Sequence, residues 1–283
     1  THFEAALAQA PRYADAAYGL ALCADRQGQA PEALARLRQA LALEPLRTEF
    51  QQLAARLDPP PPPPPPPFEK PAVVQVPFKV DLKGFQVADG RGGWKPLFLK
   101  GVNLGAALPG RFPSEFPAKS VYVGWLRDLG ELGVNAVRIY TLHPPAFYEA
   151  LREHNLAAAR PIYLIHGVWT EPPPGDDFSD PVWFAEWRAE MGRVVDLLHG
   201  RADLPARPGH AAGSYRADVS PWWIATLLGR EWEPNGVWAY HQKHPGEADW
   251  TGTYVEVRGA NATEVFMAQA MDAFLTLEMD RYG

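Results

Sequence analysis

The feature that most restricts how this chain can fold is an unbroken run of prolines at residues 59–67. Proline lacks a backbone N–H and fixes φ, so the run cannot enter a helix or a sheet and must form an extended polyproline helix. At about 3.1 Å per residue it spans roughly 28 Å. We therefore expect residues 58–77 to be a semi-rigid linker between two domains, residues 1–57 and residues 78–283. Proline runs can also bind aromatic-lined grooves, but the domain-like sequence on both sides favours a spacer.

Composition narrows the function classes. Hydrophobic residues make up 47% of the 283 residues, which is ample for a packed core, and 10 tryptophans suit either core filling or stacking on sugars. The net charge of −6, without a Lys/Arg cluster, argues against a nucleic-acid or anionic-membrane surface. Cys23 is the single cysteine, so no internal disulfide is expected. No apolar run approaches the ~20 residues that cross a bilayer.

The first domain has the pattern of a helical repeat. Residues 14–45 carry two alanine- and leucine-rich helical patterns broken at residues 27–30, and Pro11 and Pro45 lie 34 residues apart. This segment resembles the tetratricopeptide repeat family at these positions: Tyr18, Leu20, Gly28, Ala33, Ala40 and Pro45. Residues 2–11 read as the second helix of a preceding repeat, so we expect the chain to begin within a longer repeat stack. The resemblance implies a protein partner, and a spacer or capping role is the alternative.

The second domain alternates strands with helices. Short strands are expected at residues 78–82, 85–87 and 97–99, as a lid on the bottom of a barrel. Four further strands are expected, one ending at Asn103 and the others at residues 136–140, 162–165 and 223–228. Helices are expected at residues 122–132, 146–154, 181–198 and 262–282. Such alternation predicts a parallel sheet with right-handed crossovers. Two α/β folds are compatible with this alternation: a doubly wound sheet and half of a (β/α)8 barrel. The missing GxGxxG fingerprint favours the barrel.

The last of these strands points to chemistry. Residues 221–234 read PWWIATLLGREWEP, an apolar run that ends in Glu231, Trp232 and Glu233. The carboxyl ends of parallel strands form the active face of α/β folds. The sequence therefore predicts a carboxylic acid delivered into a pocket lined by tryptophan.

Three segments of the second domain resemble the first four strand ends of the retaining glycoside hydrolases built on a (β/α)8 TIM barrel. These segments are KGVNLG, LGVNAVRIYTLHPPAFYEAL and LLGREWEP. Over residues 85–283 the chain is most similar to the catalytic barrel of the β-galactosidase and β-glucuronidase family. The resemblance implies the first half of that barrel and a retaining hydrolase or transglycosylase of O-glycosidic bonds in a β-glycan, without a cofactor or metal.

The resemblance also implies roles for single residues. Arg138 matches the arginine that supports the nucleophile, and Glu231 matches the general acid/base. The family has Asn immediately before that Glu, whereas this chain has Arg230, which puts the usual contact to the sugar 2-hydroxyl in doubt. A second alignment, of WEP with the Asn-Glu-Pro of cellulase-like members, would make Glu233 the acid. Glu231 is favoured because the glycine before the pair is kept.

Glycoside cleavage needs one acid to protonate the leaving oxygen and a second carboxylate to attack or to activate water. Trp232 and Trp223 are expected to desolvate the acid and keep it protonated, while Arg230 would oppose this. The resemblance puts the nucleophile on the seventh strand, beyond Gly283. We therefore expect the chain to be a fragment without hydrolase activity of its own.

Further residues at predicted strand ends could line a sugar subsite, although each could equally be structural: Asn103, Tyr140, His143, His166 and Trp169, together with Arg230 and Trp232. His241 and His244 are expected in a polar loop, without a third metal ligand. Asp180 is expected to cap the helix that begins at Pro181. The alternative function is a non-catalytic glycan-binding scaffold. By analogy alone, repeats joined to a glycan enzyme suggest the bacterial envelope or periplasm.

Overall fold

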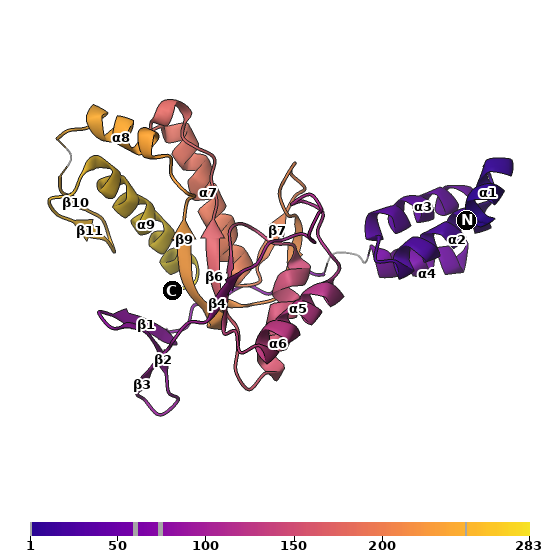
Figure 1. Ribbon diagram of the computed structural model, residues 1–283, viewed down its shortest axis with the longest axis horizontal. Coiled ribbons are helices and arrows are strands. Elements are labelled where there is room, and N and C mark those ends of the chain that lie inside the picture. Colours follow the sequence, from indigo (N-terminus) through magenta and orange to yellow (C-terminus); the bar gives the residue numbers. More distant parts are fainter. Residues whose placement is uncertain (1, 59–61, 73–75, 247) are drawn as a thin grey trace. The chain divides into compact units, whose positions relative to one another are not determined.

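The computed structural model describes residues 2–58, 62–72, 76–246 and 248–283 (Figure 1). The chain divides into two compact units, Thr1–Pro63 and Pro64–Gly283. Each unit has its own cluster of buried apolar side chains. The first three prolines of the run, residues 59–61, lie outside the described residues, as do Thr1 and Glu247.

The described part of the first unit is helical. Its helices are α1 (His2–Gln9), α2 (Ala14–Arg26), α3 (Ala30–Leu43) and α4 (Thr48–Leu57). The predicted break between two helical patterns is confirmed, and Gly28 takes up a φ of 71° there, which costs glycine least. Small side chains at Ala17 and Ala21 let α3 pack closely on α2, and Phe50 of α4 completes the core against Tyr18, with ring centroids 4.7 Å apart.

The second unit begins with a small antiparallel sheet of β1 (Phe78–Asp81), β2 (Gly84–Ala88) and β3 (Trp94–Pro96). The first two strands lie where the sequence predicts them. The prediction of a third strand at residues 97–99 was wrong. The third strand, β3, already begins at Trp94, directly after the turn that joins it to β2. The Asp89 carboxylate accepts hydrogen bonds from the backbone N–H of Arg91 and of Gly93, both at 2.8 Å, and so closes that turn.

A four-stranded sheet follows, and all of its pairs are parallel, as predicted. The strands are β4 (Gly101–Asn103), β5 (Ala136–Ile139), β6 (Tyr163–Val168) and β9 (Trp223–Leu228). Their spatial order is β4-β5-β6-β9, the same as their order in the chain. Right-handed crossovers between strands in unbroken order place every connecting helix on one side of a sheet.

The helices of the second unit are α5 (Lys119–Glu131), α6 (Pro145–Ala157), α7 (Pro181–Leu198), α8 (Pro234–Lys243) and α9 (Ala262–Arg281). Buried residues of α5, α6, α7 and α9 share one core cluster with alternate residues of the strands. In β5 and β6 these are Val137, Ile139, Leu164 and Val168, all fully buried. Successive strand residues point to opposite faces, so this face of the sheet is the one covered by helices.

The opposite face is less covered. Asn103 pairs in register with Arg138, and Arg138 pairs with Ile165. Asn103 is exposed, whereas Arg138 and Ile165 are half-buried. Leu227, on the same face of β9, is 38% exposed. The chain is thus a mixed α/β protein whose parallel sheet has a helical side and an open side.

Several short elements escaped the sequence analysis. Two hairpins, β7 (Ala202–Leu204) with β8 (Gly213–Tyr215) and β10 (Trp250–Thr251) with β11 (Glu256–Val257), follow α7 and α8. Two 3₁₀ turns occur at Pro174–Asp176 and Ser220–Trp222. The expected polar loop around His241 was wrong: His241 lies in the last turn of α8, and His244 is its C-cap.

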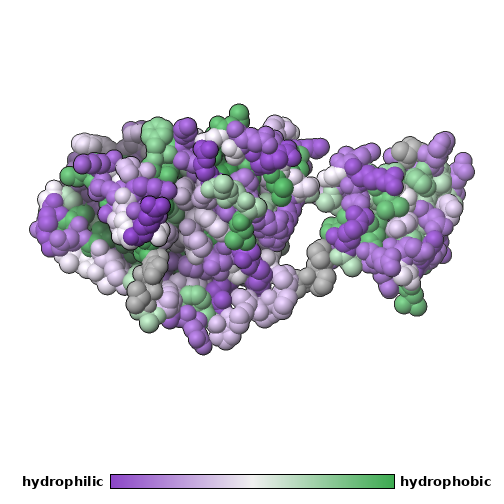
Figure 2. Space-filling model, turned by 90° about the horizontal axis from the view of Figure 1, so that it is seen from below, coloured by the Kyte–Doolittle hydropathy of each residue, from purple (hydrophilic) through white to green (hydrophobic). Residues whose placement is uncertain are grey.

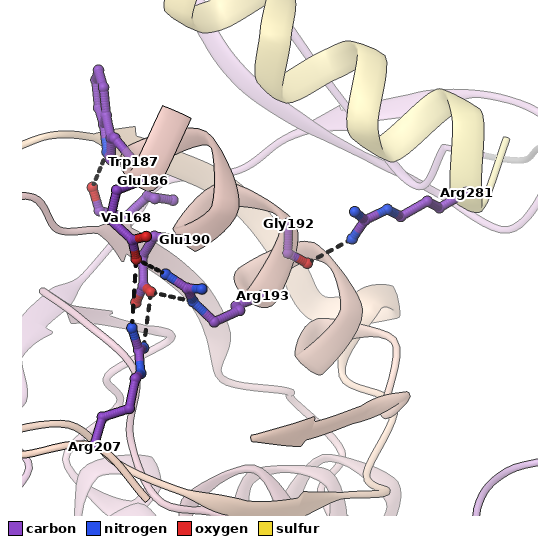
Figure 3. A network of polar contacts seen from close by, with 8 residues as sticks. All are labelled: Val168, Glu186, Trp187, Glu190, Gly192, Arg193, Arg207 and Arg281. Carbon is purple, nitrogen blue, oxygen red and sulfur yellow. Dashed lines mark hydrogen bonds and ion pairs between the residues drawn. The ribbon is translucent and has the colours of Figure 1, made fainter. Parts of the chain in front are cut away.

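A network of charged side chains ties α7 to the segment after β7 (Figure 3). The Glu190 carboxylate, with 8% of its side chain exposed, lies 2.6 Å from Nε of Arg193 and 3.1 Å from Nη2 of Arg207. Arg193 also reaches Glu186 at 2.6 Å. Glu190 therefore has two charged partners for its buried carboxylate, and Arg207 fastens the loop between β7 and β8.

The end of the predicted linker packs on the second unit. Phe68 lies edge-on to Tyr282 with centroids 5.0 Å apart, and Nζ of Lys70 donates to the carbonyl of Met279 at 2.9 Å. Arg201 donates to the carbonyl of Pro66. Residues 66–70 thus follow the surface at the C-terminal end of α9. On the face seen in Figure 2, hydrophobic side chains are interspersed with hydrophilic ones over this unit.

Candidate functional site

A pocket of about 590 Å³ lies at the carboxyl edge of the parallel sheet. Its walls come from the ends of β5, β6 and β9 and from the residues that follow them. The lining residues are Arg138, Ile139, Tyr140, Gly167, Trp169, Leu227, Leu228, Gly229, Arg230, Glu231 and Glu233. This is the edge at which α/β folds bind their ligands.

The pocket brings together six of the residues that the sequence singles out: Arg138, Tyr140, Trp169, Arg230, Glu231 and Glu233. They come from the ends of three strands that are adjacent in the sheet, and for this reason Arg138 and Glu233 meet although they lie 95 residues apart in the chain. The other four, Asn103, His143, His166 and Trp232, do not line it.

Arg138 enters the pocket from β5. Its guanidinium carbon lies 4.3 Å from the centroid of the Tyr140 ring, and Nη1 is 3.5 Å from the Tyr140 hydroxyl. Its Nε is buried and has no hydrogen-bond partner among the described residues. A guanidinium stacked on an aromatic ring keeps its in-plane donors available to a ligand.

Arg230 enters from the turn after β9 and is held on three sides. Nη2 donates to Oε1 of Glu233 at 2.9 Å, and Nη1 lies 3.8 Å from Oε2 of Glu171. The guanidinium carbon is 5.3 Å from the centroid of the Trp169 ring. Glu171 played no part in the sequence analysis. Only its position two residues beyond Trp169, past the end of β6, could have drawn attention to it.

The two glutamates of the turn differ in their partners. Glu233 pairs with Arg230, whereas Glu231 has no ion pair or side-chain hydrogen bond with the described residues. Glu231 is exposed. It therefore projects an uncommitted carboxyl group at the pocket wall.

The backbone around this turn leaves little freedom. Gly229 has a φ of 92°, and a Cβ there would lie 2.2 Å from the Trp232 ring. Trp232 turns inward and packs edge-on against Phe178, Trp183 and Trp187, at centroid distances of 5.1, 6.2 and 5.8 Å. The residue expected to line a sugar subsite thus anchors the turn in the core instead.

Trp223 also lies away from the two glutamates. Its Nε1 donates to the Thr226 hydroxyl at 2.9 Å, and its ring packs edge-on against Phe274 of α9. Neither tryptophan therefore encloses Glu231.

Gly167 is a lining residue that the sequence analysis did not name. A Cβ at this position would lie 2.2 Å from the carbonyl oxygen of Tyr140. The backbone of β5 can therefore pass close over β6 only because residue 167 has no side chain. In the sequence, only its position as a glycine near the end of an apolar strand could have indicated this close approach.

His166 and His143 lie below the pocket in a buried polar cluster. His166 is fully buried, its Nδ1 donates to the Gly167 carbonyl at 2.8 Å, and its Nε2 accepts from the Tyr148 hydroxyl at 2.8 Å. Burial lowers the pKa of His166 to about 3 and that of His143 to about 4. Both imidazoles are neutral at pH 7, and this arrangement supports a structural role.

Asn103 sits at the end of β4 on the open face of the sheet, and the next residue, Leu104, donates its N–H to the Arg138 carbonyl at 2.9 Å. Asn103 thus neighbours Arg138 without reaching the pocket wall. Asp180 caps α7 as predicted, accepting from the Trp183 N–H at 2.7 Å. Within the described parts of the chain, no three His, Cys, Asp or Glu side chains are grouped closely enough to hold a metal ion.

Comparison with known proteins identifies the first unit. The family model described as tetratricopeptide repeat matches residues 1–57, which confirms the predicted N-terminal repeat. No curated protein matches the chain, and no solved structure does either. Tetratricopeptide repeats commonly bind other proteins. Among the described helices, none has the length and apolarity needed to cross a membrane.

Proposed function

We propose that the second unit carries a glycan site and is part of a carbohydrate-active enzyme that hydrolyses or transfers O-glycosidic bonds in a β-glycan. The observation that carries the proposal is the pocket at the carboxyl edge of the sheet, where Glu231 lies with Arg138, Tyr140 and Trp169. Carboxylates flanked by exposed aromatic rings suit the cleavage of a sugar that binds through its apolar face. Tyr140 is 38% exposed and Trp169 36%.

The sheet supports a TIM-barrel origin for this unit. A doubly wound sheet reverses its strand order at the ligand-binding crevice, whereas a barrel keeps chain order around its wall. The order β4-β5-β6-β9, with helices on one side, fits a barrel wall. In that arrangement the open face with Arg138 and Leu227 would be the barrel interior.

Within this proposal Glu231 is the general acid/base and protonates the leaving oxygen. Its carboxyl has no ion-pair partner among the described residues, whereas Glu233 pairs with Arg230, which supports the choice of Glu231. A retaining mechanism needs a second carboxylate ~5–5.5 Å away. The resemblance places that nucleophile on the seventh barrel strand, which is not among the four strands of the described parallel sheet.

A second candidate is a glycan-binding scaffold without catalysis. The observation in its favour is that Glu231 is exposed and that Trp232 and Trp223 turn away from it. An acid that must stay protonated near neutral pH is usually enclosed by apolar side chains. In either case the tetratricopeptide repeat would recruit a protein partner to the glycan site.

Two measurements test these proposals. In native gels that contain soluble β-1,3- or β-1,4-glucan, the chain should migrate more slowly than in a plain gel. Azide can act as the nucleophile: it attacks the anomeric carbon of a phenyl β-glycoside while Glu231 gives its proton to the leaving phenolate, so that a glycosyl azide and phenol are formed. Azide-dependent turnover that Glu231→Gln abolishes and Glu256→Gln retains would support catalysis.

Retardation by glucan without azide-dependent turnover would favour the scaffold. The control residue, Glu256, is an exposed glutamate of β11 outside the pocket. Migration that no glucan alters would contradict both candidates.

A further inference from the structure

We propose that Arg230 is a positioning residue that selects Glu231 over Glu233 as the free acid of the pocket. It does so by pairing with Glu233 and by clamping the turn after β9 to the loop after β6. The role in catalysis rests on the proposed function, whereas the selection between the two acids does not.

The contacts of Arg230 join two segments. Glu233 is the N-cap of α8, and Trp169 and Glu171 follow β6. The Arg230 side chain is only 20% exposed, whereas those of Glu233 and Glu171 are 58% and 83% exposed. The guanidinium is thus the enclosed member of each pair, so its position determines where the carboxylates lie.

The turn offers three side chains to the pocket, and two of them neutralise each other. Gly229 is fixed by its positive φ, Trp232 by the core, and Pro234 begins α8. Residues 230, 231 and 233 remain to face the pocket. Since Arg230 pairs with Glu233 at 2.9 Å, Glu231 alone is left free to meet a ligand.

Only arginine has the chemistry for these contacts. Its planar, delocalised guanidinium can stack on Trp169 while its edge donates to two carboxylates in different directions. Lysine could hold one carboxylate but would lose much of the stacking. Methionine would keep apolar contact with Trp169 and release both glutamates.

The selection can be measured by carboxyl labelling, without any substrate. Carbodiimide activation followed by an amine tag, read by mass spectrometry, gives separate rates for Glu231 and Glu233. We expect Glu231 to be labelled about three-fold faster than Glu233, the size expected for a partly exposed ion pair. Arg230→Met should raise the rate at Glu233 and bring the ratio near one, and Arg230→Lys should restore part of the difference.

Arg258→Met is the matched control, because Arg258 pairs with exposed Glu256 at 3.1 Å. It should raise labelling at Glu256 and leave the Glu231-to-Glu233 ratio unchanged. Release of Glu233 alone should leave the rate at Glu231 unchanged, whereas unfolding of the turn would raise it as well. A rise at Glu231 as large as that at Glu233 in Arg230→Met would overturn the proposal. Equal rates in the unaltered chain would overturn it too.

The positioning role itself is read from azide-dependent turnover. Arg230→Met should reduce turnover and Arg230→Lys should recover part of it. If the chain shows no glucan retardation and no turnover while the labelling ratio behaves as expected, the proposed function fails and the selection by Arg230 stands.

Discussion

The hydroxyl of Tyr148 donates to Nε2 of His166 at 2.8 Å, and both side chains are buried in the core beneath the pocket. The same oxygen accepts the backbone N–H of His143 at 3.2 Å. This cluster links the residues after β5 to β6, and so it sets the positions of Arg138, Tyr140 and Gly167 in the pocket wall. Its chemistry requires neutral imidazoles, which gives the second unit a dependence on pH.

We expect the second unit to lose stability between pH 6.5 and pH 5. Burial lowers the pKa of His166 to about 3 and that of His143 to about 4. The unfolded chain, with imidazole pKa near 6.5, binds more protons below that pH, so the free energy of unfolding falls as pH falls. At pH 5 the loss is about 2 kcal/mol for each histidine.

Urea unfolding followed by tryptophan fluorescence measures this loss. The tryptophans all lie beyond residue 93, so their emission reports the second unit alone. An equal free energy of unfolding at pH 7 and pH 5 would contradict the prediction.

Tyr148→Phe should destabilise the second unit at pH 7 by about 2–3 kcal/mol, because it leaves Nε2 of His166 and the N–H of His143 buried without partners. Tyr163→Phe is the matched control, since the Tyr163 ring contacts Phe78 edge-on at 5.2 Å and a phenylalanine keeps that contact. The urea concentrations at which the two variants are half unfolded measure the two losses of stability. Similar shifts for the two would show that the hydroxyl of Tyr148 contributes little.

Gly167→Ala should destabilise the second unit by about 3 kcal/mol or more, because its Cβ would meet the backbone oxygen of Tyr140 at 2.2 Å. Gly101→Ala makes the same change in β4, where the nearest atom to the new Cβ, the Ala136 oxygen, is 3.6 Å away. That is ordinary van der Waals contact, and little change is expected. Thermal unfolding of the pair separates them, and a Gly167→Ala variant as stable as Gly101→Ala would refute the close approach.

Glu190→Ala should cost about 1–2 kcal/mol, because Arg193 and Arg207 lose their shared, largely buried carboxylate and keep only the exposed Glu186, at 2.6 and 3.7 Å. Glu186→Ala removes another partner of Arg193 on the same helix, but the Glu186 side chain is 69% exposed. Its loss should cost less than about 0.5 kcal/mol. Urea unfolding at low and high salt compares the two. Equal losses would mean that the burial of Glu190 does not matter.

The sequence predicts the parallel sheet because each strand is an apolar run followed by a helical pattern, and the runs ending at Asn103, Ile139 and Leu228 show this clearly. It also finds pocket residues that lie within three positions of a strand end, such as Trp169 after β6 and Glu231 after β9. It does not predict the inward turn of Trp232, which depends on Phe178, Trp183 and Trp187 far away in the chain.

Contacts between side chains of different loops could not be predicted from the sequence either. The contact of Arg230 with Glu171 depends on the backbone turn after Gly229 and on how β6 and β9 align. Helix α8 escaped because it is short and polar, with Pro234 at its start and two histidines at its end. Local pattern thus specifies elements and their order, whereas side-chain direction in the turns is decided by tertiary packing.

Trp169→Ala should weaken binding of soluble β-glucan about ten-fold, if the pocket binds sugar as proposed. The indole lines the pocket and is 36% exposed, so it offers a flat apolar surface to a sugar ring. Trp238→Ala removes a more exposed indole, 64% exposed, from α8 outside the pocket and should leave the affinity unchanged. Migration in native gels over a series of glucan concentrations gives both affinities. Equal affinities for the two variants would place the sugar elsewhere on the unit, because Trp169 lines the same pocket as Arg138 and Glu231.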